Sequence, residues 1–182
     1  MVRPIILGVM SLTLAALPGC IIVSDNDIQE SSSSSLATSP ETRVAIEQTL
    51  DELHEAASLA QEDRYFKLFT ENAIFLGTDA TERWSKSQFR AYAHPIFSQG
   101  KGWTYTKKSR AVYMARDHRT AWFDESLDNA KLGECRGTGV LIKESGRWRI
   151  AQYNLTIPVP NAIAEDVVRQ IRARPAPAGL GG

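Results

Sequence analysis

The second half of the chain is a series of strand-like runs separated by short turns, and this order restricts the possible folds more than any other feature. From Trp103 onward, four runs are rich in aromatic and β-branched residues: "WTYTKKSRAVYMA", "TAWFDESLDNA", "GECRGTGVLIKE" and "RWRIAQYNLTIPV". Such runs favour strands. The connections "RDHR", "NAKLG" and "ESGR" are short enough for hairpin turns, and Ser145-Gly146 is the clearest of them. The sequence therefore predicts an antiparallel meander.

The first half of the domain has the sequence pattern of helices. Ser39 suits an N-cap, Pro40 the first helical position and Glu41 the positive end of a helix. Apolar residues then recur every three or four positions, which predicts one buried stripe: Val44, Ile46, Leu50, Leu53, Ala57 and Leu59. The segment "EDRYFKLFTENA" predicts a short second helix carrying Tyr65, Phe66 and Phe69, followed by a brief strand, "AIFLG".

A third helix is expected near residue 86, because Ser85 and Gln88 form a capping box, and Pro95 should kink or end this helix. A last amphipathic stretch, "NAIAEDVVRQIRAR", predicts a C-terminal helix ahead of the tail "PAPAGLGG". Helices followed by a run of antiparallel strands indicate an α+β fold.

The N-terminus has the pattern of an export signal. One positive charge precedes the uncharged run "IILGVMSLTLAALPG", which is shorter than the roughly 20 residues of a membrane-spanning helix. The run ends in "LPGC", which resembles the lipobox of bacterial lipoproteins, although Pro18 departs from the usual small residue. We expect a signal peptide over residues 1–19, lipidation of Cys20, a flexible serine-rich tether over 20–39, a domain over 40–173 and a disordered tail over 174–182.

The composition and the placement of the cysteines, histidines and glycines give no support for several classes of function. The chain has 21 basic and 21 acidic side chains, so its zero net charge gives no argument for nucleic-acid binding. With Cys20 acylated, Cys135 is the only remaining thiol; no histidine lies near it in sequence, and a packed thiol is expected rather than a nucleophile. The three histidines have no metal-ligand spacing, and "GTGV" lacks a phosphate-loop lysine. No metal or cofactor is predicted.

The element order, with "AWFDESLD" and "GTGVLIKESGRWRIAQYNLTIPVPN", resembles the SnoaL-like branch of the nuclear transport factor 2-like superfamily over roughly residues 42–158. The resemblance implies a cone-like, strongly curved antiparallel sheet wrapped around N-terminal helices, with a pocket at the mouth of the cone. That superfamily includes isomerases, dehydratases and cyclases as well as dimerisation modules, so the fold does not decide the function. No histidine occupies the C-terminal strand, and no dehydratase-type Asp–His pair is predicted.

Strand alternation suggests one candidate pocket group. In "AWFDESL", Phe123, Glu125 and Leu127 share the more apolar face, which we assign to the interior. A carboxylate there needs a partner, and Arg136 on the next strand is the predicted one. The pair would either orient a polar or anionic ligand or form an internal salt bridge. Further aromatic side chains are candidates for the pocket wall or for ordinary core: Trp84, Tyr92, Trp103 and Tyr153.

The stretch "FLGTDATERW" connects a strand end to a helix start and carries two acids. Asp79 and Glu82 are candidate acid/base residues, because burial next to another carboxylate raises a carboxyl pKa. The alternative is a polar connector in which Asp79 forms an Asx-turn and Glu82 pairs with Arg83.

Together these features predict a small-molecule-binding or partner-binding module held in the cell envelope by a lipid anchor, at the outer membrane in a Gram-negative cell. An acid/base enzyme and a pure dimerisation module are the alternatives. A homodimer is expected through the outer sheet face, where Trp122 points outward.

Overall fold

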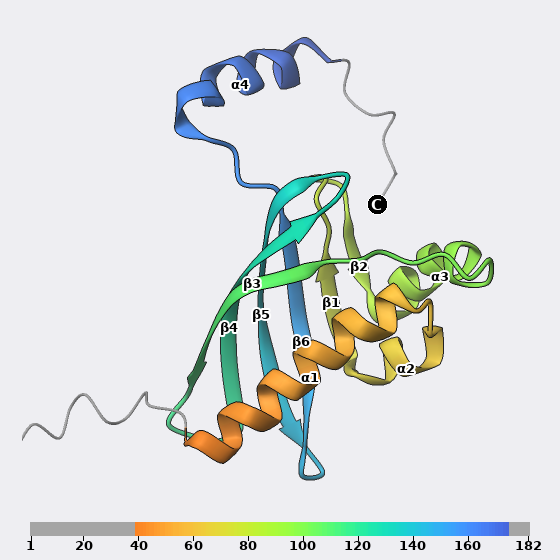
Figure 1. The fold of residues 1–182 in the computed structure, drawn as a ribbon, viewed down its shortest axis with the longest axis vertical. Coiled ribbons are helices and arrows are strands. Elements are labelled where there is room, and N and C mark those ends of the chain that lie inside the picture. The colour runs from red at the N-terminus through yellow and green to blue at the C-terminus, as the bar shows by residue number, and fades with distance from the viewer. Residues whose placement is uncertain (1–38, 175–182) are drawn as a thin grey trace, which may run out of the picture. The chain divides into compact units, whose positions relative to one another are not determined.

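The computed structural model describes residues 39–174, so the predicted signal peptide, Cys20 and the tail from residue 175 onward lie outside the described residues. Helices α1 (Pro40–Ser58), α2 (Glu62–Lys67) and α3 (Lys86–Phe97) cover one face of a curved six-stranded sheet (Figure 1). The strands are β1 (Phe69–Leu76), β2 (Arg83–Ser85), β3 (Thr106–Met114), β4 (Thr120–Asn129), β5 (Gly133–Glu144) and β6 (Arg147–Thr156). The α+β prediction is confirmed.

Helix α1 begins as its sequence predicts and buries most of the predicted stripe. The Ser39 side chain accepts a hydrogen bond from the backbone N–H of Thr42 at 3.3 Å, and Pro40 occupies the first turn. Ile46, Leu50, Leu53 and Ala57 are buried. Val44 and Leu59, which we included in the stripe, are exposed. Val44 lies about 200° around the helix from Ile46, and Leu59 caps the C-terminus beyond the last turn.

The second helix is shorter than expected. It ends at Lys67, and strand β1 already begins at Phe69, which pairs with Ile150 of β6. The Leu68 carbonyl accepts the Ile150 backbone N–H at 2.9 Å, so pairing with a distant strand overrides the local helical preference. The third helix starts with the predicted capping box, since Ser85 accepts the Gln88 N–H at 3.3 Å and donates its own N–H to the Gln88 side chain at 2.9 Å.

The sheet has the strand order β2-β1-β6-β5-β4-β3. Strands β3 to β6 form the predicted antiparallel meander, and Ser145 and Gly146 turn with positive φ angles of 48° and 79°. Strand β1, however, runs parallel to β6, so the sheet is not wholly antiparallel. The physical reason is that β1 reaches β6 through a long crossover that contains α3 and the meander, and such connections permit parallel pairing.

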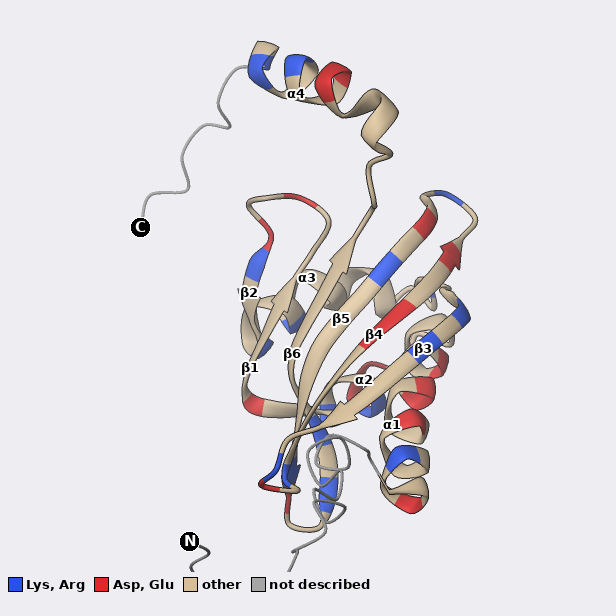
Figure 2. Cartoon of the chain, turned by 90° about the vertical axis from the view of Figure 1, so that its left-hand side faces the viewer, with Lys and Arg blue, Asp and Glu red and all other residues tan. Residues whose placement is uncertain are grey.

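The two ends of the sheet carry different connections. The β4–β5 turn lies at one end, with the C-terminal ends of β1 and β6, and the β3–β4 and β5–β6 turns lie at the other (Figure 2). A core of aromatic and aliphatic side chains fills the space between the helices and the sheet, including Phe66, Phe89, Phe123 and Ile150.

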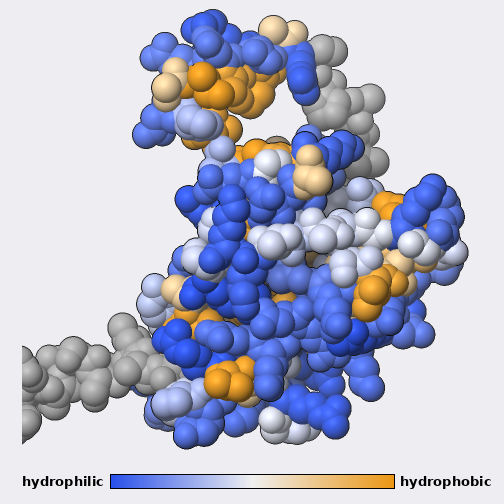
Figure 3. Space-filling model, in the orientation of Figure 1, coloured by the Kyte–Doolittle hydropathy of each residue, from blue (hydrophilic) through white to orange (hydrophobic). Residues whose placement is uncertain are grey.

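The C-terminal segment forms η2 (Asn161–Ile163) and the predicted helix α4 (Ala164–Ala173). None of the residues of α4 is buried, and Ile163, Val168 and Ile171 are exposed apolar side chains. Apolar residues show as orange atoms on this segment, at the top of Figure 3. Within residues 39–174, no helix is long and apolar enough to cross a membrane.

Candidate functional site

A cavity of about 520 Å³ opens at the end of the sheet that carries the β4–β5 turn. Its wall is formed by helices α1, α2 and α3, by strands β1, β2 and β6 and by the segment before β3, and Asn129 to Leu132 of the β4–β5 turn form part of its rim. The wall is mainly apolar and aromatic. Its polar side chains come from His54, Tyr65, Thr78, Glu82, Tyr92, Thr104, Tyr105, Asn129, Lys131 and Tyr153.

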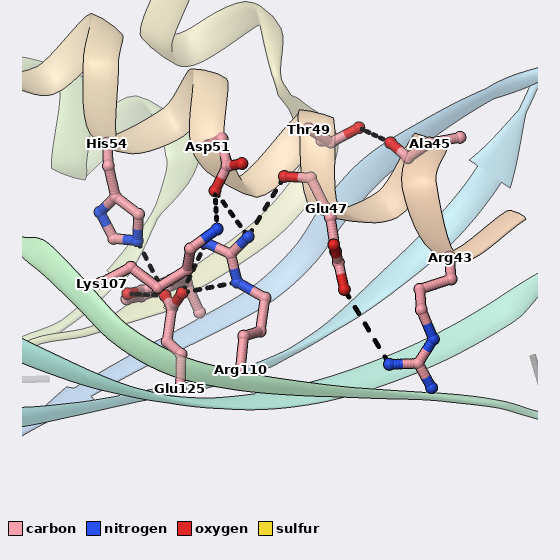
Figure 4. A network of polar contacts seen from close by, with 10 residues as sticks. Arg43, Ala45, Glu47, Thr49, Asp51, His54, Lys107, Arg110 and Glu125 are labelled. Atoms are coloured by element: carbon pink, nitrogen blue, oxygen red, sulfur yellow. Dashed lines mark hydrogen bonds and ion pairs between the residues drawn. The ribbon is translucent and has the colours of Figure 1, made fainter. Parts of the chain in front are cut away.

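His54 connects this cavity to a buried carboxylate. It lies on α1, one turn after the buried Leu50, and its side chain is 12% exposed and lines the cavity. Its Nε2 lies 2.9 Å from Oε1 of Glu125 on β4 (Figure 4). No carboxylate–histidine pair is predicted from the sequence, whereas the structure forms one across 71 residues of chain.

Glu125 faces inward as predicted and is fully buried. Its Oε1 also accepts the Tyr153 hydroxyl at 2.8 Å. Its Oε2 accepts a hydrogen bond from Nε of Arg110 at 2.8 Å and lies 2.7 Å from Nη2 of the same guanidinium. Arg110 also reaches Asp51 at 2.7 Å and the Glu47 carbonyl at 3.2 Å, so it joins β3 to α1. The carboxylate is therefore held by three donor side chains from three different elements.

These contacts determine the ionisation state of Glu125. Burial alone would raise the pKa of this carboxyl, but the hydrogen bond of His54, the charge of this histidine in its protonated form, and the charge and hydrogen bond of Arg110 outweigh it, and the pKa is lowered below its ordinary value. The phenol of Tyr153 has its pKa raised by burial and by the Glu125 charge, so it stays protonated and donates. Glu125 is thus ionised at neutral pH.

An ionised carboxylate only accepts hydrogen bonds, and so His54 must donate from Nε2. In the neutral imidazole the proton then resides on Nε2 and the lone pair on Nδ1. Nδ1 has no hydrogen-bond partner among residues 39–174, and it points away from Glu125 (Figure 4). The pair therefore presents a proton acceptor on a cavity-lining side chain, oriented from behind by a fixed negative charge.

Stacked aromatic rings form one wall of the cavity. Trp84 stacks on Tyr92 with centroids 4.7 Å apart and on Phe89 with rings inclined by 7°. Phe89 also stacks on Phe75, and Trp103 packs against Phe89. Tyr92 is exposed, so this wall reaches the rim. Burial raises the pKa of the neighbouring Tyr105 to about 12.

Most of the predicted pocket aromatics lie on the cavity wall: Trp84, Tyr92, Trp103 and Tyr153. Phe123 is buried in the core against Tyr153 and does not line the cavity.

The predicted Glu125–Arg136 pair is wrong. Arg136 is exposed and stands opposite Ser126, whereas Gly137 stands opposite Glu125. Residues directly opposite in an antiparallel pair share a face, so Arg136 belongs to the outer face. Glu125 takes its charge partner from β3 instead, where Arg110 is its register partner.

Gly137 leaves the room that the polar network needs. A β-carbon at this position would lie 2.4 Å from the Tyr153 hydroxyl and 2.7 Å from Oε1 of Glu125. Any side chain on β5 here would displace the two groups that hydrogen-bond to each other. The absence of a side chain at Gly137 therefore allows the hydrogen bond between Tyr153 and Glu125 to form.

Asp79 and Glu82 have separate surroundings. Asp79 is exposed and accepts the Thr81 backbone N–H at 2.9 Å and the Thr81 hydroxyl at 2.6 Å, and these hydrogen bonds lower its pKa. This is the Asx-turn alternative. Glu82 is half-buried, lines the cavity, and accepts the Asp79 N–H at 3.1 Å while it packs over Gly77. Asp79 does not reach the cavity, and the two do not form a close carboxyl pair.

Cys135 is buried, as expected for a packed thiol, and burial raises its pKa. Within residues 39–174, no cluster of His, Cys, Asp or Glu has a geometry that would hold a metal ion.

The model of the SnoaL-like domain family matches residues 46–160. This chain belongs to that family. The match contains His54, Arg110, Glu125 and Tyr153, so the polar network lies within the family domain. No curated protein matches the sequence.

Solved structures share the fold at low sequence identity. An NTF2-like protein of unknown function from Pseudomonas putida has a TM-score of 0.57 at 12% identity, covering 69% of this chain and 92% of that one. A candidate scytalone dehydratase from Novosphingobium aromaticivorans has a TM-score of 0.53 at 11% identity, covering 64% and 84%. A candidate calcium/calmodulin-dependent kinase II association domain from Exiguobacterium sibiricum has a TM-score of 0.52 at 13% identity, covering 69% and 98%. At these identities the likeness shows the fold alone.

Proposed function

We propose that the cavity binds a small, largely apolar molecule with a planar ring and one polar group. The observation that carries this proposal is the combination of a stacked aromatic wall with a single oriented imidazole. Trp84 and Tyr92 provide flat apolar surface, and a ligand ring stacked on them gains both buried area and favourable ring contacts. Cavities of several hundred Å³ with a mainly apolar and aromatic wall are typical of small-molecule sites.

A second function, proton transfer, is favoured by the His54–Glu125 pair. A ligand that presents an acidic C–H or O–H to Nδ1 would lose its proton to the imidazole, and the ionised Glu125 would stabilise the imidazolium that forms. The proton would return from Nδ1 to another atom of the same molecule. Isomerisation and elimination are the reaction classes of this kind, and the fold likeness to a candidate dehydratase is compatible with them.

We also propose that the site operates in the cell envelope. The support is the apolar run that ends in "LPGC", followed by the serine-rich segment before the domain. A lipidated Cys20 and a tether of this length would hold the cavity near a membrane without restricting its orientation.

A ligand screen on the full chain tests the binding function. Planar aromatic ketones and phenols are added one at a time, and the change in melting temperature is recorded for the wild type, Trp84→Ala, His54→Gln and His118→Asn. His118 lies in the exposed β3–β4 turn and is the matched histidine control. A ligand that stabilises the wild type and the control should lose most of its effect with Trp84→Ala. Equal stabilisation of the wild type and Trp84→Ala would contradict the proposed cavity.

The same variants separate binding from proton transfer. With a hit in hand, deuterium incorporation from solvent into the ligand is measured by NMR. His54→Gln keeps a donor toward Glu125 and removes the proton acceptor, so exchange should fall at least 100-fold while binding is retained. Exchange that persists unchanged in His54→Gln would exclude His54 as the base.

A further inference from the structure

A second hollow, of about 390 Å³, lies between the first half of α1 and the start of β6. We call it the basic groove and define it by the residues that line it: Ala45, Thr49, Glu52, Lys67, Leu68, Gly146, Arg147, Trp148 and Arg149. It includes the β5–β6 turn, whereas the rim of the cavity includes the β4–β5 turn. The two hollows therefore open toward opposite ends of the sheet, although α1 contributes to both, with Glu52 in the groove and Leu53 and His54 in the cavity.

The lining of the groove contains more basic side chains than acidic ones. Lys67 and Arg147 have no ion pair within residues 39–174. Arg149 donates to the Lys67 carbonyl, and its Nε is 3.8 Å from Glu144. The one acid of the lining, Glu52, is already engaged by Arg64 at 3.0 Å. Two cations thus face the groove without a counter-charge.

The floor of the groove is apolar. Trp148 is buried, and Leu68 and Ala45 are partly buried against the core. An apolar floor under a cationic rim suits an anion that is attached to a less polar group. Arginine and lysine together match the charge and the several acceptor oxygens of a phosphate.

The positive surface continues onto the neighbouring β3–β4 turn. The backbone carbonyl of Arg119 accepts a hydrogen bond from the backbone N–H of Lys143 at 2.8 Å. The β3–β4 and β5–β6 turns therefore lie side by side (Figure 2). Arg116 and Arg119 are exposed there, and the carboxylate of Asp117 between them is occupied by backbone N–H groups of Arg119 and Thr120. The same end of the molecule receives the start of α1, where Arg43 donates to the Val112 carbonyl near the end of β3.

We propose that the basic groove binds a phosphate group, and that the phosphate belongs to the headgroup of an anionic phospholipid. The exposed arginines of the β3–β4 turn would then meet neighbouring headgroups. In this arrangement the end of the domain where α1 begins rests on the membrane, and the mouth of the cavity faces away from it. The proposal is independent of what the cavity binds.

Vesicle binding by the full chain tests the source of the phosphate. Co-sedimentation is compared between vesicles of 30 mol% phosphatidylglycerol in phosphatidylcholine and vesicles of phosphatidylcholine alone. The groove variant is Lys67→Gln with Arg147→Gln. The control, Arg83→Gln with Lys101→Gln, removes one arginine and one lysine that are exposed outside the groove. All proteins share the same N-terminal segment, so its own membrane affinity cancels in the comparison.

Each Lys or Arg near an anionic surface strengthens binding about fivefold, so the groove variant should lose roughly 30-fold of the preference for phosphatidylglycerol vesicles. The control should lose much less. Hydrogen exchange at residues 143–149 should slow on the anionic vesicles in the wild type and in the control variant, and should not slow in the groove variant. Equal losses in the two double variants would show a response to net charge alone and would overturn the proposal.

Inorganic phosphate, titrated against the full chain while amide NMR shifts are followed, is the second probe. Saturable shifts at Arg147 and Trp148 that disappear in the groove variant would support the phosphate site. The same shifts without any vesicle preference would support a soluble phosphate compound and overturn the lipid source. Absence of binding to both probes would overturn the site.

Discussion

Replacing Glu125 with glutamine should destabilise the domain by about 3 kcal/mol. The carboxylate is fully buried, and the Arg110 side chain opposite it is 3% exposed. The amide of the variant keeps an acceptor for Tyr153 and His54 but removes the negative charge, and its NH₂ group then faces a guanidinium that also only donates. Removing one member of a buried ion pair costs about 3–5 kcal/mol.

The lower end of that range applies, because Arg110 keeps a second carboxylate. Asp51 lies 2.7 Å from its Nη1, but Asp51 is 53% exposed, so its charge is partly screened by water. For a domain of this size, a loss of about 3 kcal/mol corresponds to a fall in melting temperature of roughly 10 °C. The loss of about 3 kcal/mol is a large part of the total free energy of unfolding of a domain, which is roughly 5–15 kcal/mol.

Urea denaturation of the full chain, followed by tryptophan fluorescence, measures this loss as a lower midpoint at unchanged slope. Arg136→Gln is the control, because this arginine is exposed on the outer face and should change the free energy of unfolding by less than 0.5 kcal/mol, about the effect of an ordinary surface substitution. A Glu125→Gln effect as small as the control's would refute the reasoning about the buried network.

The loss should also depend on pH. The folded-state pKa of Glu125 is lowered from its ordinary value of 4.5, so the stability it contributes is present above pH 4.5 and is lost as the pH falls through the folded-state pKa. The difference between the wild type and Glu125→Gln should be full at pH 7 and narrow below pH 4.5. A difference that stays constant down to pH 3 would show that folding does not lower the pKa of this carboxyl.

Three further outcomes are expected. Gly137→Ala should lower the free energy of unfolding by about 2 kcal/mol, because its methyl group would separate Tyr153 from Glu125; an unchanged urea midpoint would contradict this. Trp122→Lys should convert the expected homodimer to a monomer in light scattering, and a wild type that is already monomeric would disprove the outer-face interface. Cys20→Ser should move the protein out of the detergent phase in phase partitioning, whereas identical partitioning would argue against acylation.

Local sequence signals predicted the helix starts and the hairpin turns well. A cap such as Ser39 or Ser85 and a turn such as Ser145-Gly146 satisfy their hydrogen bonds within four residues, so neighbours in sequence contain all the information. The predicted boundary between α2 and β1 was wrong because it depends on a residue that is distant in sequence. Whether Phe69 is helical or extended depends on Ile150, which lies far along the chain.

The candidate site was predicted in part. The alternation of "AWFDESL" correctly turned Glu125 inward, but its partners come from other elements. No role in the pocket was predicted for His54, although it lies four residues after Leu50 and one after Leu53, next to the buried stripe of α1. Counting outward from the β4–β5 turn, where Asn129 pairs with Gly133, would have placed Gly137 and not Arg136 opposite Glu125. Counting outward from the β3–β4 turn, where Met114 pairs with Ala121, would likewise have placed Arg110 opposite Glu125, because the register shift of β3 lies beyond Arg110, between Lys107 and Ser109.

The parallel pairing of β1 with β6 has a consequence for the order in which the chain acquires its structure. Strands β3 to β6 are joined by short turns and can associate as soon as each is made. Strand β1, although synthesised before them, has only the three-residue β2 as a neighbour until β6 emerges. The aromatic side chains of α2 and β1, among them Phe66 and Phe75, therefore stay without their sheet partners during most of translation. The core therefore closes only after the residues up to Leu155, at the end of β6, have been synthesised.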